Sequence, residues 1–136
     1  METVELNLSA VEHDLISGMS TADAALELCR IHLRRVHPGV TFITPSRGAD
    51  LRVRVPAGPE FDLEVKGTEK TGVAWSQFKV SSQQSHDLLV KGIPLYRITE
   101  IGSRQVKIFI MKHGADFEMA HEPRWSVHPP RKLNAG

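Results

Sequence analysis

The stretch of sequence that decides the fold is EFDLEVKGT, residues 60–68. Charged and apolar residues alternate along its first seven positions, which predicts a β-strand with one apolar face. The charged residues share the opposite face, and they are Glu60, Asp62, Glu64 and Lys66. Three acids on one face of a strand repel one another unless a cation lies among them. The charged face of this strand therefore needs a physical explanation.

A second strand precedes this one, and the two together predict a hairpin. Residues 49–55, ADLRVRV, alternate in the same way, and the turn at 56–60 is rich in proline and glycine. Counting outward from this turn places Asp50 opposite Lys66. That register predicts that Asp50, Glu64 and Lys66 meet at one end of the hairpin.

Such a group of side chains predicts a metal site. Two converging carboxylates repel each other, and a divalent cation with oxygen ligands removes this repulsion. Asp50 and Glu64 would hold Mg²⁺, with Mn²⁺ as a substitute, and the backbone carbonyl of Val65 could be a further ligand. Lys66 could orient or deprotonate a water molecule, or neutralise developing charge. Two acids, a metal ion and a lysine are the groups needed to hydrolyse a phosphodiester bond.

A simpler interpretation of the same pattern stays open. Alternating charges are also typical of the solvated face of an antiparallel sheet that has no catalytic role. In that case Arg52 and Arg54 offset the neighbouring acids. The run of three acids argues against this interpretation, and so does the sharp end of the strand at Gly67 and Thr68, which leaves room at its tip.

The rest of the chain predicts one mixed α/β domain. Predicted helices cover residues 10–18, 21–36 and 82–91. Predicted strands cover residues 40–44, 49–55, 61–66, 73–80, 93–101 and 104–112. We expect a single domain in residues 1–120, with its core in about 21–112, followed by a proline-rich basic tail in 121–136.

Composition limits the class of protein. The chain has 136 residues, of which 40% are hydrophobic, and a formal net charge of +1. This charge does not indicate nucleic-acid binding by bulk charge alone, although local patches matter more than the total. The single cysteine, Cys29, excludes an internal disulfide. No apolar run approaches the ~18 residues of a membrane helix, and the N-terminus does not resemble a signal peptide. We expect a cytoplasmic protein with no membrane partner.

The pattern Asp50, then Glu64-Val65-Lys66, resembles that of the PD-(D/E)XK nuclease superfamily. Members of this superfamily place an acid at the start of one strand and acid-x-Lys on the next. Over residues 21–100, the predicted order of elements also resembles the restriction-endonuclease-like αβββαβ core, a mixed central sheet flanked by helices. The chain also resembles archaeal Holliday-junction resolvases of this superfamily. The stretch EVKGT resembles a segment of the nuclease-like domain at the C-terminus of NO VEIN-type proteins. Ala49 departs from the proline that gives the superfamily its name.

The resemblance implies two further site residues. Many members carry a glutamate on the first helix that reaches the metal, and Glu27 is the match here. Some members place a glutamine near the lysine, which makes Gln83 an accessory candidate. Each also has a plainer explanation, because Glu27 can pair with Arg30 or Arg34 on its own helix, and Gln83 can be an ordinary solvated residue.

The function implied by the resemblance is a metal-dependent endonuclease that hydrolyses DNA phosphodiester bonds. A restriction, repair or junction-processing role would fit, and RNA is not excluded as a substrate. Members often act as homodimers, so we expect a homodimer, and a partner protein could supply targeting. The alternative is a non-catalytic nucleic-acid- or protein-binding module on the same fold. The cations available for nucleic-acid contact include Arg47, Arg52, Arg54, Lys70 and Lys79.

Overall fold

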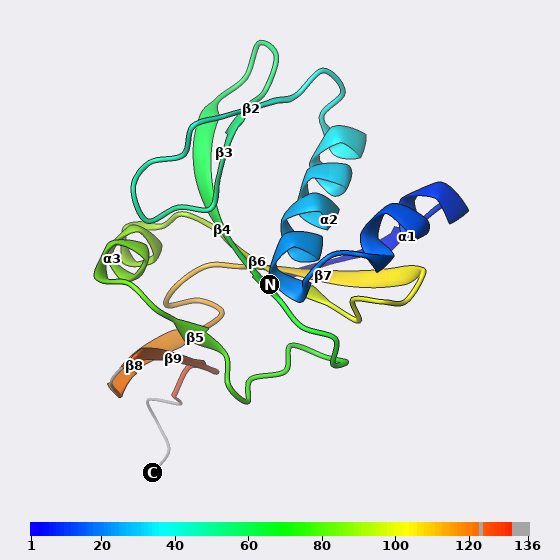
Figure 1. Cartoon of the computed structure of the whole chain (residues 1–136). Coiled ribbons are helices and arrows are strands. Elements are labelled where there is room, and N and C mark those ends of the chain that lie inside the picture. Colours follow the sequence, from blue (N-terminus) through cyan, green and yellow to red (C-terminus); the bar gives the residue numbers. More distant parts are fainter. Residues whose placement is uncertain (123, 132–136) are drawn as a thin grey trace.

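The computed structural model describes residues 1–122 and 124–131, which form a mixed α/β fold (Figure 1). Its helices are α1 (Ala10–Ser17), α2 (Thr21–Val36) and α3 (Gln83–Lys91). The large sheet has the strand order β1 (Glu2–Asn7), β7 (Gln105–Met111), β6 (Leu95–Thr99), β4 (Glu60–Gly67), β3 (Leu51–Arg54) and β2 (Thr41–Ile43). The small sheet has the order β5 (Lys79–Val80), β9 (Arg124–His128) and β8 (Glu118–Glu122). The ladder between β4 and β6 is parallel, and the ladders between the other neighbouring strands are antiparallel.

The three helices begin and end where the sequence predicts, because each has a capping residue. Ser9 and Glu12 form a reciprocal capping box at the start of α1. Ser20 caps α2 and Ser82 caps α3, each through its side-chain oxygen. Gly92 ends α3 in a left-handed conformation with φ of 110°. In the part of the chain that is described, no helix is long and apolar enough to span a bilayer.

One face of the large sheet packs against α2, and α1 packs against α2 in turn (Figure 1). The centre of this core is fully buried and includes Leu28, Val53, Leu63 and Ile98. Helix and strand approach most closely at Gly67, where an added Cβ would lie 2.6 Å from the Cβ of Ala25. The absence of a side chain at this position therefore sets the distance between α2 and the end of β4.

The small sheet and α3 build a second core, separate from the one beneath α2. Its buried side chains come from both sheets and from α3, and include Phe78, Leu89, Leu95, Met111 and Phe117. Figure 1 shows the small sheet and α3 on the side of β6 away from α2. The large sheet is thus covered on both faces, and residues 62–65 in the middle of strand β4 are buried.

The structure differs from the sequence prediction in three places. Residues 73–80 form only the two-residue strand β5, preceded by a loop. Residues 118–122 form β8 and residues 124–128 form β9, in a stretch where the sequence predicted no helix or strand. The N-terminal strand β1 was not predicted at all, although it pairs along its whole length with β7. The end of the predicted tail, 132–136, lies outside the described residues, as does residue 123.

Candidate functional site

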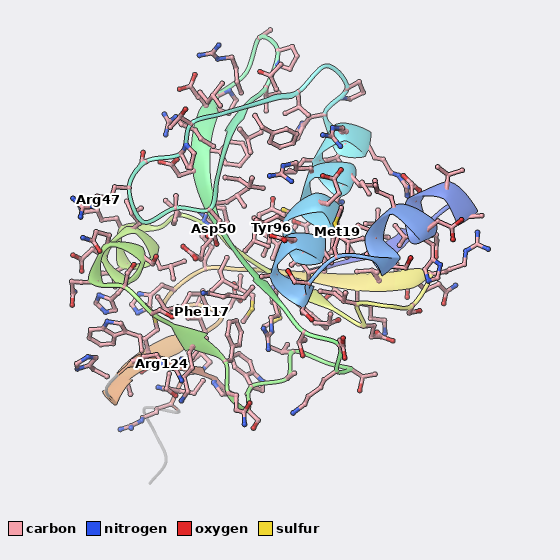
Figure 2. The ribbon with its side chains drawn as sticks, viewed as in Figure 1. Met19, Arg47, Asp50, Tyr96, Phe117 and Arg124 are labelled. Atoms are coloured by element: carbon pink, nitrogen blue, oxygen red, sulfur yellow. The ribbon has the colours of Figure 1, made fainter. Side chains whose placement is uncertain are left out.

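The site lies at the point along β4 where its hydrogen-bonded partner changes from β3 to β6. Its first half, up to Leu63, pairs with β3, and its second half, from Glu64, pairs with β6. The chain leaves the β3 ladder at Asp50, whose backbone N–H still donates to the carbonyl of Leu63 at 3.0 Å. Figure 2 shows Asp50 at this point, where the β3–β4 hairpin meets the rest of the molecule. Polar side chains of both strands can gather here because no strand covers this side of β4.

The register of the hairpin differs by two residues from the sequence prediction. Leu51 pairs with Leu63 and Arg54 pairs with Glu60, so Asp50 lies across from Glu64 and not from Lys66. The reason is the loop, which is shifted by one residue toward the N-terminus: the backbone N–H of Val55 donates to the carbonyl of Pro59. The correction brings the two carboxylates of the predicted site closer together.

Asp50 is held in place by the strand beside it. Its Oδ2 accepts a hydrogen bond of 2.7 Å from the backbone N–H of Val65. The N–H and C=O of one residue in a strand point to the same side, so the carbonyl of Val65 also points toward Asp50. The carboxylate and this carbonyl therefore face the same space at the end of the β3 ladder.

Glu64 is the most unusual residue of the site. Only 2% of its surface is exposed, and its Oε2 is buried without a hydrogen-bond partner. Its other oxygen, Oε1, lies 3.9 Å from Nζ of Lys66. A buried carboxylate is normally fully paired, because an unsatisfied buried oxygen is costly. The interpretation of this face as merely solvated is therefore wrong at Glu64.

The surroundings of Glu64 change its acidity. Burial raises the pKa of this carboxyl group, and the neighbouring Asp50 raises it further, to about 9. The charge of Lys66 and the hydroxyl of Ser85 act in the opposite direction and only partly offset these effects. Without a further cation, Glu64 thus holds a proton at neutral pH.

The donor set fits Mg²⁺ in its chemistry. Asp50, Glu64 and the carbonyl of Val65 all offer hard oxygen atoms, and Oε2 of Glu64 has no hydrogen-bond partner. Within residues 1–122 and 124–131, no group of three or more His, Cys, Asp or Glu side chains is arranged to hold a metal. Mg²⁺ does not require such a group, because it commonly binds one or two carboxylates together with water and substrate phosphate.

A cavity opens next to these residues on the α2 side. Its volume is about 390 Å³, and its walls come from the start of α2 and the end of β4. Asp50 and Lys66 line it together with Thr21, Ala22 and Ala25. The small side chains of α2 leave this space open at the polar end of the hairpin.

The two residues implied by the resemblance alone have other partners. The carboxylate of Glu27 is 3.2 Å from the guanidinium groups of both Arg30 and Arg34. Gln83 donates to Asp87 on its own helix at 2.8 Å. In this conformation both residues follow the plainer explanation, and neither is joined to Asp50 or Glu64.

The outer half of the quoted strand also has a structural explanation. Arg52 pairs with Glu60 at 2.9 Å and with Asp62 at 2.8 Å. Arg54 pairs with Glu60 at 3.1 Å. These arginines therefore neutralise the acids that do not belong to the site, and this engagement leaves them less available to phosphate. Among the other predicted nucleic-acid contacts, Arg47 and Lys70 are exposed and Lys79 is half-buried.

Sequence reasoning missed Ser85, the residue of α3 that faces the site. Its hydroxyl donates to the carbonyl of Gly48 at 2.6 Å and lies beside Glu64. Gly48 has φ of +96°, and an added Cβ there would meet the backbone of α3. The sequence RGAD, with glycine two residues before Asp50, was the available signal for this close packing.

Sequence reasoning also missed Arg97, which lines a second, basic cavity together with Lys66 and Arg124. Neither arginine lies in a recognisable motif. The two are brought together only by the packing of the small sheet against the large one. The site therefore consists of Asp50, Glu64 and Lys66, with Ser85 of α3 beside Glu64. The 390 Å³ cavity and the basic cavity lie next to these residues. The chain matches no family model, no curated protein and no solved structure.

Proposed function

We propose that this protein is a metal-dependent endonuclease that hydrolyses DNA phosphodiester bonds. The observation that carries the proposal is the buried carboxylate of Glu64, which has an unpartnered oxygen beside both Asp50 and Lys66. Burying this group without a bound cation costs stability, because Oε2 is left without a hydrogen-bond partner.

The order of elements supports a PD-(D/E)XK type of nuclease. The helix α2 is followed by β2, β3 and β4, then by α3 and β6, with β5 inserted before α3. This order agrees with the αβββαβ core of that superfamily. Asp50 lies at the start of β3 and Glu64-Val65-Lys66 on β4, as the superfamily pattern requires.

Each residue of the site has a distinct role in the proposed reaction. Asp50, Glu64 and the Val65 carbonyl would hold Mg²⁺ or Mn²⁺. The bound ion would polarise the phosphate and make its water more acidic. Lys66 would orient the attacking water or stabilise the negative charge that develops on the phosphate. Ser85 would keep the Glu64 side chain in position.

The proposal is tested by incubating the purified protein with four substrates in Mg²⁺, Mn²⁺ or EDTA. The substrates are supercoiled plasmid, single-stranded DNA, a four-way DNA junction and RNA. We expect metal-dependent cleavage of at least one DNA substrate. Lys66→Ala and Glu64→Gln should each reduce the rate by about a hundredfold or more, whereas Glu5→Gln, on the exposed side of β1, should not change it.

Cleavage that persists in EDTA, or in both site variants, would contradict the proposal. The product on plasmid also tests the expected homodimer, because two sites acting together produce linear DNA and a single site produces a nick. Sedimentation of the free protein gives the oligomeric state independently.

A second function, a nucleic-acid-binding module that does not cut, has one observation in its favour. The described residues bring together two acids and no third, so the site has few protein ligands for a metal. Such a module would bind DNA with equal affinity in EDTA and in Mg²⁺, and Glu64→Gln would leave that affinity unchanged.

A further inference from the structure

A basic cavity lies beside the carboxylates, between the large sheet and the small one. Its volume is about 570 Å³. Four cationic side chains line it, each from a different strand: Lys66 of β4, Lys79 of β5, Arg97 of β6 and Arg124 of β9. In the described part of the chain, no aspartate or glutamate lines this cavity. Four positive charges facing one space without a negative one make it a site for an anion.

Arg97 is the residue that distinguishes this cavity from an ordinary basic surface. It is only 5% exposed, and its guanidinium lies over the ring of Phe78 at 3.9 Å from the centroid. It donates to the carbonyls of Val73 and Ala74 at 2.8 and 2.9 Å, and to that of Gly67 at 3.3 Å. These contacts fix the plane of the guanidinium before any ligand arrives.

The charge of Arg97 is not balanced by an acid. Among the side chains described in residues 1–121 and 124–131, no carboxylate lies within 4.0 Å of its guanidinium. Burial lowers its pKa to about 10, so it remains a cation at neutral pH. A buried cation that is hydrogen-bonded only to neutral carbonyls is costly to the fold, and a bound anion would offset this cost.

The basic cavity borders the proposed catalytic site. Lys66 and Gly67 line both the basic cavity and the cavity that contains Asp50. The two cavities therefore lie on either side of the end of β4. Figure 2 shows Arg124 on the small sheet, away from Asp50, so only an extended ligand could contact both residues.

We propose that the basic cavity binds a phosphate group of the nucleic-acid strand that is cut at Asp50 and Glu64. The inference rests on the proposed function for the identity of the strand. Arginine guanidinium groups bind phosphate through paired hydrogen bonds. Arg97 and Arg124 supply two such guanidinium groups to the cavity. The ligand is either a terminal phosphate or an internal phosphodiester, since both present the same oxygen atoms.

The test is binding in EDTA, which does not depend on cleavage or on a metal. A fluorescently labelled single-stranded oligonucleotide, with or without a 5′-phosphate, is titrated with protein at several salt concentrations. Inorganic phosphate is added as a competitor. The variant Lys79→Gln/Arg124→Gln removes two cavity charges, and the control Lys91→Gln/Lys107→Gln removes two exposed charges elsewhere. Arg97 itself is left intact because its burial makes a folding defect the expected result.

We expect the cavity variant to bind at least about tenfold more weakly than the wild type. The slope of log affinity against log salt should fall by up to about 1.4, because each phosphate contact on a single strand contributes about 0.7. The control should match the wild type. A preference for the 5′-phosphorylated strand assigns the cavity to a terminal phosphate, and equal binding assigns it to an internal phosphodiester.

Three results would overturn the inference. They are equal weakening in the control and the cavity variant, no binding of either strand by the wild type, and binding of inorganic phosphate without binding of a strand. If only the proposed nuclease activity is wrong, the result is different. Strand binding in EDTA would then still depend on Lys79 and Arg124, but no metal-dependent cleavage would occur.

Discussion

The carboxyl group of Glu64 is subject to opposing influences from the residues around it. Burial and Asp50 favour its protonated form, whereas Lys66 and Ser85 favour the charged form. A divalent cation at Oε2 would reverse this balance, because it stabilises the charged form far more than a lysine 3.9 Å away does. Glu64 is thus a group whose charge is set by whether a cation is bound.

A prediction about pH follows from the acidity of Glu64. Its pKa in the folded protein is about 9, compared with 4.5 for a free side chain. Between these values the folded protein holds a proton that the unfolded chain has lost, so stability falls as pH rises, by up to ~1.4 kcal/mol per pH unit. In Glu64→Gln this contribution is absent, and the variant should gain stability relative to the wild type as pH rises.

The measurement is urea unfolding in EDTA at about pH 5.5, 7 and 8.5. Glu5→Gln is the matched control, because Glu5 is exposed, and it should follow the wild type. Parallel pH profiles for wild type and Glu64→Gln would show that Glu64 does not hold a proton in the folded protein.

Among the elements, the β3–β4 hairpin and the contact of β4 with α2 position the site. The hairpin and the capped helices were predictable from sequence because their signals are local: alternation, a Pro/Gly turn and serine caps. The exact register was not, because a loop that moves by one residue at each end shifts the pairing by two. That shift decided whether Asp50 faced Lys66 or Glu64.

The contact between β4 and α2 can be tested at Gly67. In Gly67→Ala the new methyl group would lie 2.6 Å from Cβ of Ala25 and 2.9 Å from Cδ1 of Ile101. We expect a loss of stability of about 1–3 kcal/mol, as for overpacked cores, and impaired activity because β4 carries Glu64 and Lys66. Chemical denaturation measures the first effect and the plasmid assay the second.

Gly18→Ala is the control for this experiment. No atom lies within 4 Å of a Cβ added at Gly18, and its φ of −91° suits any residue. Its stability should change by less than about 0.5 kcal/mol. If Gly67→Ala were equally harmless, the spacing of α2 and β4 would not depend on glycine, and the description of this contact would need revision.

In the whole molecule, the small sheet covers the face of the large sheet that α2 leaves open. This arrangement was not predictable from local sequence, because β5 has only two residues and pairs with β9 more than forty residues later. The strand β1 was missed for the same reason, since its partner β7 lies about a hundred residues away. The basic cavity depends on these pairings, so the meeting of Arg97 with Arg124 carried no sequence signal, whereas the pattern of Asp50, Glu64 and Lys66 did.

The small sheet should therefore be essential to stability. Phe117 is fully buried in the second core, and Phe117→Ala should destabilise the protein by about 3–5 kcal/mol. Leu15→Ala, at a residue 54% exposed, is the control and should have a small effect. Thermal or urea denaturation distinguishes the two. A negligible effect at Phe117 would mean that the small sheet and its core are not needed for stability.

The central claim is that Asp50 and Glu64 hold a divalent cation, and calorimetric titration with Mn²⁺ at about pH 8 tests it most directly. The wild type should bind Mn²⁺ at a single site per chain. Glu64→Gln and Asp50→Asn should each bind it more than about tenfold more weakly while remaining folded, and Glu5→Gln should bind it as the wild type does. Absence of Mn²⁺ binding by the wild type, or equal affinity in all four proteins, would contradict the claim.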